Sequence, residues 1–550
     1  MAETAAEPWL TEACAKAMQV NENNLCRLLS DNRNTVFGQE HGFASIRSSE
    51  EYRKAVPLCS YERLQPYMER MIAGEKEVLT VYPIAGVCRT SGTEGQPKYI
   101  PVSDTALERY ADRIEWYKNR VHRQAGGKRL FVNGFRVGLT EKKREYLLSE
   151  LYYRYLFQNG FFSFSEFAGG RETLFGQSAY DMLYGKVWTA FAVEDITTIE
   201  SIFLYDQLLF FQYMQKHWRG ILKHMEEKRI PDRIRISETT RAKLLSLPVT
   251  RDRLRRAAEE CGRGFDGIAP RLWNGLVLSS GISSASFETE DRSLRRYLGK
   301  TPIYYFACVA SECHMGVALR PEECRYVMLP ENAFYEYLPW RQNAQEEAEE
   351  TLLPGQVRRG ELYEVVLTNF SGLYRYRLGD VVRVTGFLGE SPIVEFVLRK
   401  NQFLNVAGEK MSICQAERAV MNLAREHQLP IRRYCIGQLG WEYPAGYGAV
   451  FELEEKNACG EADRAAAHMA KWLDRALGEQ NLDYRDVRKL GFLKRVEVLI
   501  LETEEYAAFL EENGMTGGHN KPRHVAGMIR EDVWKKWKEK QKTDLRSAKA

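Results

Sequence analysis

The order of strand-like and helix-like segments is the feature that most constrains the fold of this chain. Helical patterns come first and cover residues 60–74, 103–122, 141–157 and 195–228. Apolar, strand-like segments then follow at residues 275–279, 302–310, 326–329, 362–368, 381–386 and 393–398, with a charged helix up to Leu298. Strands that first alternate with helices and then cluster predict an α/β fold, in which the N-terminal part of the chain forms a large mixed α/β domain.

A second, smaller domain is expected after this cluster. The chain has 550 residues, which is too long for one small hydrophobic core and predicts roughly two to four domains. A polar stretch at residues 399–407 is typical of a linker. Helices at 412–427 and 461–477 and strands at 431–437, 447–453 and 494–501 then predict an α+β domain. The expected division is an N-terminal domain over residues 1–398, a hinge over 399–407 and a mobile C-terminal lid over 408–550.

The composition argues against nucleic-acid and membrane partners. The 78 basic and 75 acidic residues leave a net charge of +3, too small to favour a polyanion. The most apolar stretch, residues 202–214, is interrupted by Asp206 and is shorter than the roughly 18 apolar residues of a membrane span. Eleven cysteines without a disulfide-type spacing favour reduced thiols. We therefore expect a cytoplasmic protein without a secretory signal, of undetermined oligomeric state.

The C-terminal stretch from Trp534 to Lys540 is rich in lysine. It could form a helix on a membrane surface. We interpret it instead as a solvated C-terminal helix anchored by its two tryptophans.

A glycine- and hydroxyl-rich stretch follows a short strand predicted at residues 84–89. Its residues are Thr90, Ser91, Gly92, Thr93, Glu94, Gly95, Gln96, Pro97 and Lys98. Glycines let successive backbone N–H groups point into one concavity, and hydroxyls and a lysine add donors for a polyanion. A helix expected to begin at Ser103 strengthens the pattern, since phosphates bind between a strand and a helix. The spacing differs from a Walker A loop. The stretch predicts a phosphate-binding loop, with an ordinary polar turn as the alternative.

A second group of polar residues ends an apolar strand, in the run Cys308-Val-Ala-Ser311-Glu312-Cys313-His314. A carboxylate at the end of a strand lies where open α/β sheets bind ligands. Glu312 could hold Mg²⁺, which prefers oxygen donors and bridges phosphates. A surface carboxylate is one alternative. A zinc site is the other, but these cysteines and His314 match no common zinc spacing.

Two further stretches carry candidate residues. Asp380 follows a glycine in Tyr374-Arg-Tyr-Arg-Leu-Gly-Asp380, at an expected turn between strands, where its carboxylate could accept hydrogen bonds from the vicinal hydroxyls of a ribose. An ordinary Gly-Asp turn is the alternative. The glycine-rich run 514–523 ends in two cations, Lys521 and Arg523, and an exposed lysine of this kind is usually without a catalytic role.

In this order, the four stretches resemble those of the GH3 (auxin-responsive) acyl-acid amido synthetases, a branch of the adenylate-forming enzymes. The loop at 90–98 resembles the Ser/Thr-Ser-Gly-Thr-x-Gly-x-Pro-Lys signature, and Tyr374–Asp380, Arg399-Lys-Asn401 and Lys521-Pro-Arg523 resemble the family's later motifs. Gly316-Val-Ala-Leu-Arg-Pro and Glu336-Tyr-Leu-Pro339 add to the match. The resemblance covers about residues 60–530.

The resemblance implies a large N-terminal domain that binds ATP and an acyl acid, closed by a small C-terminal domain. It places Thr90, Ser91, Gly92, Thr93, Gly95 and Lys98 on the phosphates, Ser311 near the nucleotide, Glu312 on Mg²⁺, Asp380 on the ribose and Lys521 at the adenylation step. Arg399 lies at the implied hinge and belongs to the implied nucleotide-binding residues. The cofactors implied are ATP and Mg²⁺, and the partners are a small carboxylic acid and an amine or amino acid.

The chain departs from the family at two points. Cys308 replaces an aromatic residue of a five-residue motif, which removes an aromatic platform for the adenine, and Asn401 replaces the aspartate-type hinge residue of wider relatives. No residue of the acyl pocket, expected between about 110 and 285, can be assigned. The sequence therefore predicts adenylation of a carboxylic acid and transfer of the acyl group to an amine. An acyl-CoA ligase or acyl-protein synthetase and a catalytically inactive nucleotide-binding protein are the alternatives.

Overall fold

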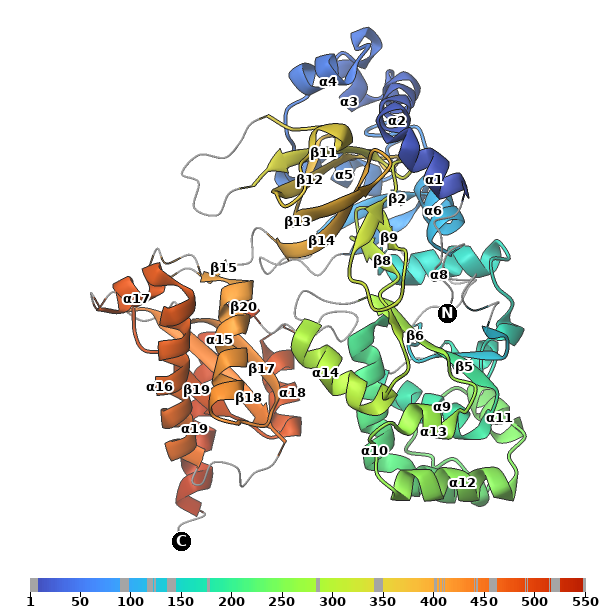
Figure 1. Ribbon diagram of the computed structural model, residues 1–550, viewed down its shortest axis with the longest axis vertical. Coiled ribbons are helices and arrows are strands. Elements are labelled where there is room, and N and C mark those ends of the chain that lie inside the picture. The colour runs from blue at the N-terminus through green and yellow to red at the C-terminus, as the bar shows by residue number, and fades with distance from the viewer. Residues whose placement is uncertain are drawn as a thin grey trace. The chain divides into compact units, whose positions relative to one another are not determined.

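Figure 1 shows a computed structural model of the chain. The structure describes residues 8–89, 98–115, 122, 125–135, 145–175, 179–282, 287–340, 350–399, 403–404, 406–407, 409, 411–439, 441, 444–454, 462–489, 491, 493–513, 515 and 525–547. The described residues up to Val397 form one compact unit, the N-terminal unit, and those from Leu398 onward form a second, the C-terminal unit. The hinge expected over residues 399–407 stays a prediction.

Five helices precede the first strand of the N-terminal unit: α1 (Pro8–Ala15), α2 (Ala17–Asn32), α3 (Val36–Glu40), α4 (Ser49–Ala55) and α5 (Tyr61–Ile72). Only α5 was predicted. Helix α2 covers an edge strand, β11 (Phe334–Pro339), because the buried Asn21 side chain pairs with its backbone. Asn21 Nδ2 donates to the Tyr335 carbonyl (3.1 Å), and the Tyr335 amide donates to Asn21 Oδ1 (2.7 Å). The amide side chain thereby occupies hydrogen-bonding groups that an open strand edge would leave exposed.

Two smaller sheets follow. One has the order β2-β1-β4, built from β1 (Ile84–Arg89), β2 (Tyr99–Ser103) and β4 (Glu145–Tyr146). The other is parallel, with the order β3-β5-β6-β7, built from β3 (Lys128–Phe131), β5 (Ile196–Phe203), β6 (Leu278–Ile282) and β7 (Ile303–Tyr304). Helices α9 (Ala179–Ala192), α10 (Leu204–Glu226) and α12 (Arg251–Gly262) lie beside this parallel sheet (Figure 1).

The prediction of one helix over residues 195–228 is wrong in its first part. Residues 196–203 form the buried strand β5, and helix α10 begins only at Leu204. The run Ile196-Thr-Thr-Ile-Glu-Ser-Ile-Phe203 is rich in β-branched residues, which favour strands because their side chains pack well on a pleated surface.

A seven-stranded sheet with the order β11-β12-β13-β14-β10-β9-β8 forms the rest of the N-terminal unit. Its other strands are β8 (Ala307–Val309), β9 (His314–Ala318), β10 (Tyr326–Met328), β12 (Leu362–Thr368), β13 (Tyr376–Leu388) and β14 (Ser391–Arg399). The sheet curls until its two edges approach each other: the hydroxyl of Tyr335, on β11, lies 3.6 Å from Cys313 Sγ, in the turn between β8 and β9. Strands distant in the sheet order thus come close in space.

The C-terminal unit is an α+β fold with two hydrophobic cores. Its sheet has the order β19-β18-β17-β20, from β17 (Ile431–Leu439), β18 (Gly446–Leu453), β19 (Glu497–Ile500) and β20 (Val525–Met528). Helices α15 (Ile413–Glu426) and α16 (Ala462–Gln480) pack on the face that carries Tyr434 and Ile436. Helices α18 (Thr503–Glu512) and α19 (Glu531–Ser547) pack on the opposite face, which carries Cys435. Neighbouring β17 residues therefore enter different cores, as the two-residue period of a strand requires.

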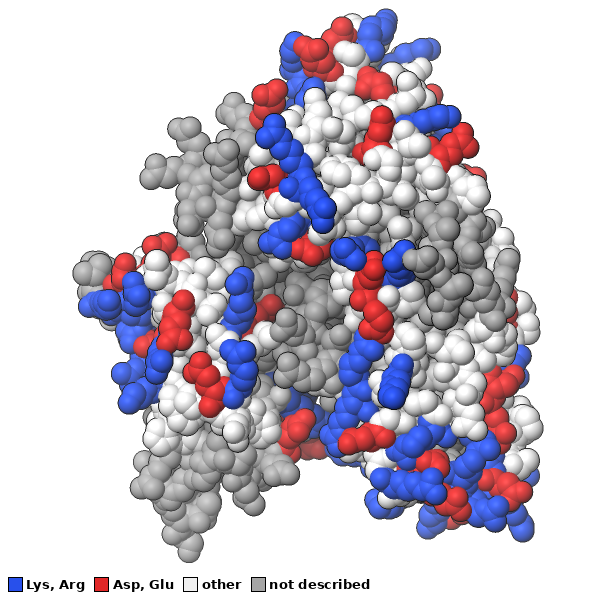
Figure 2. All heavy atoms as spheres, in the orientation of Figure 1, with Lys and Arg blue, Asp and Glu red and all other residues white. Residues whose placement is uncertain are grey.

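The C-terminal helix α19 confirms the interpretation of the lysine-rich tail. Trp534 and Trp537 are buried in the second core. Lysines 536, 538 and 540 form ion pairs with Glu512, Glu497 and Glu505 of the same unit. Among the described helices, none combines the length and the apolar character needed to cross a bilayer. On the face drawn in Figure 2, described basic and acidic side chains are interspersed rather than gathered by sign.

Candidate active site

The predicted phosphate loop connects two paired strands. Strand β1 ends at Arg89, as predicted, and Arg89 pairs with Tyr99 of the antiparallel strand β2. The expectation that the loop joins a strand directly to a helix is therefore wrong. Helix α6 (Asp104–Tyr110) begins after β2, where the Ser103 side chain caps it by accepting from the Ala106 amide (3.2 Å). A helix N-terminus consequently gives no support to phosphate binding here.

Residues 90–97, which include Thr90, Ser91, Gly92, Thr93 and Gly95, lie outside the described residues. The last residue of the predicted loop, Lys98, is described. Its ammonium group lies 5.1 Å from the centre of the Tyr61 ring of α5, and the Tyr61 hydroxyl accepts from the Tyr99 amide (3.1 Å). Helix α5 therefore holds the C-terminal end of the predicted loop.

Ser311 and Glu312 occupy a tight turn between β8 and β9. The flanking residues Ala310 and Cys313 exchange two backbone hydrogen bonds, of 2.9 and 3.2 Å, which close the turn. Both side chains of the turn are partly exposed, whereas Cys313 is fully buried. The placement of Glu312 at the end of an apolar strand is confirmed.

Asp380 lies inside β13, at a β-bulge, and the expected turn between strands is wrong. Val381 pairs with Glu364 and Arg377 pairs with Val366, so three residues of β13 lie opposite one residue of β12. Gly379 adopts a φ of +78°, which glycine tolerates without strain. Bulges redirect side chains and are common beside active sites. Asp380 is buried, with 4% of its surface exposed.

Several side chains converge on the Glu312 turn. The Tyr376 hydroxyl, at the start of β13, donates to Glu312 Oε1 (3.4 Å). The Glu312 carbonyl oxygen accepts from Asn369 Nδ2 (2.8 Å) and from the Tyr110 hydroxyl of α6 (3.4 Å). Asn369 Oδ1 in turn accepts from the amides of Ser371 and Leu373 (2.9 and 3.1 Å). The turn is thus fixed by residues from α6, β13 and the β12–β13 connection.

The two carboxylates predicted as binding residues belong to the same region of the N-terminal unit. Burial raises the pKa of the Cys308 thiol to about 12, and the negative charge of Asp380 adds to the rise. Burial likewise raises the pKa of Cys313 to about 12, with a further contribution from Glu312. These thiols remain protonated near neutral pH, which disfavours them as metal ligands. Oxygen donors are therefore the functional groups that this region offers.

Sequence reasoning did not assign roles to Tyr376, Asn369 or Tyr110. Tyr376 belongs to a motif quoted above, and only its position before Gly-Asp could have indicated it. Asn369 and Tyr110 are 57 and 202 residues from Glu312 in the sequence, and no local pattern marks them. His314, stacked 4.6 Å from Tyr110, is buried, and its pKa falls to about 3 because of burial.

Two predicted site residues remain, Arg399 and Lys521, and both follow the N-terminal unit in the sequence. Arg399 is the last residue of β14. Lys521 lies outside the described residues, as do Lys400 and Asn401.

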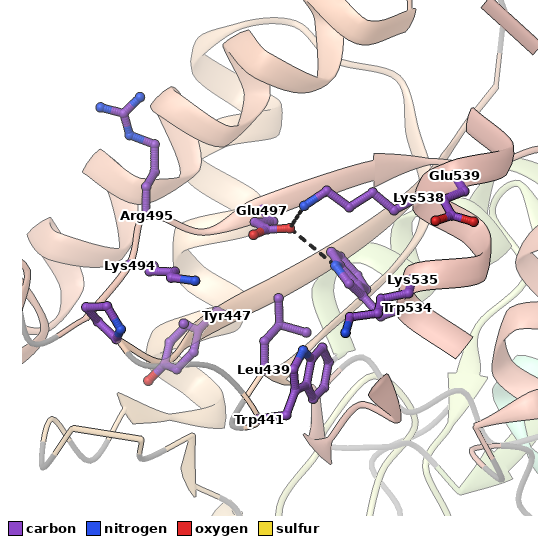
Figure 3. A pocket seen from close by; sticks show the side chains of 12 residues that line it. Leu439, Trp441, Tyr447, Lys494, Arg495, Glu497, Trp534, Lys535, Lys538 and Glu539 are labelled. Carbon is purple, nitrogen blue, oxygen red and sulfur yellow. Dashed lines mark hydrogen bonds and ion pairs between the residues drawn. The ribbon is translucent and has the colours of Figure 1, made fainter. Parts of the chain in front are cut away.

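A cavity of about 260 Å³ lies within the C-terminal unit (Figure 3). Trp441, Trp534 and Lys494 line it. Glu497, also in its wall, accepts hydrogen bonds from Trp534 Nε1 (3.2 Å) and Lys538 Nζ (2.5 Å). Of the predicted site residues that the structure describes, none lines this cavity.

Comparison with known proteins identifies the family. The sequence matches the GH3 family N-terminal domain over residues 7–303, the central domain over 326–399 and the C-terminal domain over 414–527. It is 26% identical over 537 residues to a jasmonoyl–L-amino acid synthetase, GH3.5, of Oryza sativa subsp. japonica, covering 91% of this chain and 90% of that protein.

Solved structures agree on the fold. The AtGH3.15 acyl acid amido synthetase in complex with 2,4-DB superposes with a TM-score of 0.83 at 21% identity, covering 96% of this chain and 95% of that one. A 2-hydroxyisobutyryl-CoA ligase in its postadenylation state has a TM-score of 0.51 at 12% identity, with 97% and 90% coverage. The chain belongs to the GH3 family and has the two-part α/β fold of adenylate-forming enzymes.

Proposed function

We propose that this chain is an ATP-dependent acyl-acid amido synthetase. It activates a carboxylic acid as its acyl-adenylate and passes the acyl group to an amine, which we expect to be an amino acid. One observation carries the proposal: two separate motifs meet, because the Tyr376 hydroxyl donates to Glu312 Oε1 (3.4 Å) and Asp380 follows Tyr376 on the same strand, β13. Family membership supports it, since the relative described above is named a jasmonoyl–L-amino acid synthetase.

Residue roles follow from the chemistry of each group. Asp380 offers a carboxylate at a bulge, which suits the two neighbouring hydroxyls of a ribose. Ser311 contributes a hydroxyl beside the nucleotide, and Arg399 contributes a guanidinium for phosphate. The phosphates are assigned to the loop residues Thr90, Ser91, Gly92, Thr93, Gly95 and Lys98.

The Glu312 carboxylate fits Mg²⁺, because it is a partly exposed oxygen donor in a region whose thiols stay protonated. When bound, Mg²⁺ supplies positive charge that offsets the repulsion between ATP and the acid. Tyr376 keeps Glu312 in place through its hydrogen bond to Oε1.

The two half-reactions place different demands on the enzyme. In the first, a carboxylate oxygen of the acid attacks the α-phosphorus of ATP, and pyrophosphate leaves. Two anions meet in this step, so positive charge from Lys521 and the phosphate loop lowers its barrier. In the second, the amine nitrogen attacks the acyl carbon, AMP leaves and the amine loses a proton. In our proposal the C-terminal unit closes about the hinge at 399–407, and this closure keeps water away from the acyl-adenylate.

The test is acid-dependent exchange of labelled pyrophosphate into ATP, with a panel of aryl, indolyl and aliphatic carboxylic acids. The proposal predicts exchange with at least one acid and a strong loss of exchange in Asp380→Ala and Lys521→Ala. Undiminished exchange in Asp380→Ala would show that the ribose site is misplaced. ATP binding without exchange for any acid would favour the catalytically inactive alternative.

The acceptor separates amide synthesis from acyl-CoA synthesis, since both share adenylation. Amino acids and coenzyme A are offered in parallel to the enzyme charged with the best acid, and the proposal predicts an amide and no thioester. We also propose a cytosolic location. Of the cysteines that the structure describes, none is in a disulfide, which fits a reducing compartment.

A further inference from the structure

Arg375 adopts an unusual backbone conformation directly before β13. Its φ is +41°, in the left-handed region that residues other than glycine rarely occupy. Its amide donates to Thr368 Oγ1 (3.0 Å), and its carbonyl oxygen accepts from the Cys59 amide (2.9 Å). Because Tyr376 follows immediately, this conformation sets the direction in which β13 begins.

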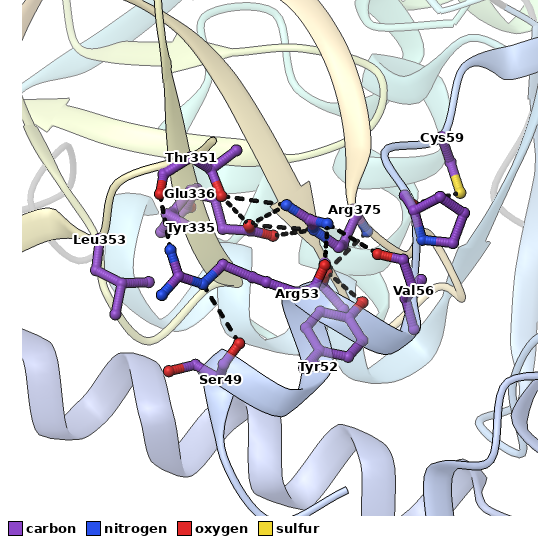
Figure 4. A network of polar contacts seen from close by, with 12 residues as sticks. Ser49, Tyr52, Arg53, Val56, Cys59, Tyr335, Glu336, Thr351, Leu353 and Arg375 are labelled. Carbon is purple, nitrogen blue, oxygen red and sulfur yellow. Dashed lines mark hydrogen bonds and ion pairs between the residues drawn. The ribbon is translucent and has the colours of Figure 1, made fainter. Parts of the chain in front are cut away.

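The Arg375 side chain is buried, and each of its five N–H groups has an acceptor (Figure 4). Nε lies 3.1 Å from both carboxylate oxygens of Glu336. Nη2 donates to Glu336 Oε1 (2.9 Å) and Thr351 Oγ1 (3.1 Å), and Nη1 donates to the carbonyl oxygens of Arg53 and Val56 (2.8 Å each). Only a guanidinium presents five donors in this fixed planar arrangement.

This network joins segments that are distant in the sequence. Arg53 and Val56 belong to α4 and its C-terminal end, Glu336 to β11, and Thr351 to the segment beside β11. Glu336 has no exposed surface. A buried ion pair is weak evidence for stability, because removing both charges from water costs about as much as their attraction returns. Because every N–H group of the Arg375 guanidinium has an acceptor, we interpret the network as fixing one conformation of the chain rather than as adding stability.

We propose that Arg375 is a positioning residue for the nucleotide site: its anchored side chain holds the left-handed backbone that directs Tyr376 towards Glu312. The Tyr376 hydroxyl reaches Glu312 Oε1 at 3.4 Å, and Asp380 follows four residues later on the same strand. Arg375 itself is buried among protein acceptors and acts through Tyr376. This inference rests on the proposed function, in which Glu312 and Asp380 bind the cofactors.

Arg377 is a matched control two residues along the chain. It also pairs with a buried carboxylate, Glu364, with Nη2 2.6 Å from Oε2. Its side chain is 24% exposed, against 5% for Arg375, and it lies within β13, paired with Val366. Replacing it removes an arginine–glutamate pair of the same strand without removing the anchor of the left-handed residue.

The first arm of the test is structural and does not depend on the proposed function. Crystal structures of Arg375→Lys and Arg377→Lys are compared with the wild type. The proposal predicts that the Tyr376 hydroxyl leaves hydrogen-bond distance of Glu312 in Arg375→Lys and keeps it in Arg377→Lys. A retained contact in both variants overturns the proposal. If Arg375→Lys does not fold, the double replacement Arg375→Met/Glu336→Met, which leaves no buried charge unpaired, answers the same question.

The second arm is a double-mutant cycle on acid-dependent pyrophosphate exchange. We expect Arg375→Lys and Tyr376→Phe each to lower kcat/KM for ATP about 10-fold or more. The double variant should be no less active than the less active single variant, because both substitutions remove the same interaction. In the control cycle, the loss of kcat/KM in the Arg377→Lys/Tyr376→Phe double variant should equal the product of the two single losses, within about 2-fold. Independent multiplication of the Arg375 and Tyr376 effects overturns the proposal. Absence of exchange in the wild-type enzyme contradicts the proposed function instead, and the structural arm then decides the role of Arg375.

Discussion

Lys186 gives a stability prediction that follows directly from burial. It lies in the middle of α9 with 2% of its surface exposed, and burial lowers the pKa of its amine from 10.5 to about 7. Burial is the whole cause, because no nearby charge contributes to the shift. In the unfolded chain, water keeps this amine protonated up to high pH. Folding therefore requires that the amine either lose its proton or be buried as a charge without its water, and both cost free energy.

The sign of the effect follows from proton binding in the two states. Between pH 7 and 10.5 the unfolded chain binds a proton at this amine and the folded chain does not, so stability rises with pH. The penalty is fully present below pH 7 and disappears as the pH passes 10.5. The two pKa values give a penalty of roughly 4 kcal/mol at pH 7 and roughly 2 kcal/mol at pH 9. Lys186→Met, which keeps the length of the side chain without the amine, removes this penalty.

We expect Lys186→Met to raise the free energy of unfolding, and we expect the gain to fall by about half between pH 7 and pH 9. The measurement is pulsed hydrogen exchange with mass spectrometry of α9 peptides along a urea series at both pH values. Lys223→Met on α10 is the control, since its side chain is 71% exposed and should change stability by less than about 0.5 kcal/mol. A gain that does not change with pH, or a loss of stability at both pH values, would refute the reasoning.

Three further predictions concern the site and the C-terminal unit. Asp380→Asn keeps the size of the side chain but removes its charge, and should raise the KM for ATP in pyrophosphate exchange about 10-fold or more, whereas an unchanged KM contradicts the ribose assignment. Gly379→Ala places a Cβ at a φ of +78° where no atom lies within 4 Å, so backbone strain alone should cost about 1–2 kcal/mol in urea unfolding; Gly386→Ala, in the same strand and not at positive φ, is the control and should cost less. Trp534→Ala empties part of the core between the sheet and α19 and should destabilise the C-terminal unit by about 3–5 kcal/mol, measured by hydrogen exchange of α19 peptides, while protection in α9 stays unchanged.

Elements with an unambiguous local pattern were predictable from the sequence. Strands β1 and β12 have the predicted bounds, because each is a short apolar run between polar or turn-forming residues. The buried strand β5 was mistaken for the start of α10, since an apolar run without clear alternation fits either structure. The four helices before α5 were not predicted.

The site was predictable as motifs but not as an arrangement. Glu312 and Asp380 could be named from their sequence context, yet their shared region depends on how the seven-stranded sheet curls. The Asn369 and Tyr110 contacts to Glu312 link segments that only the tertiary fold brings together. The bulge at Asp380 depends on the pairing of β13 with β12, which a single strand's sequence does not reveal.

The most direct test of the proposed activity is the complete reaction. Enzyme, ATP, Mg²⁺, the acid identified by exchange and a mixture of amino acids are incubated, and the products are quantified by mass spectrometry. The account predicts an amide conjugate formed in equal amount to AMP, dependent on both the acid and an amino acid. Formation of ADP, or of AMP without any amide, would contradict it.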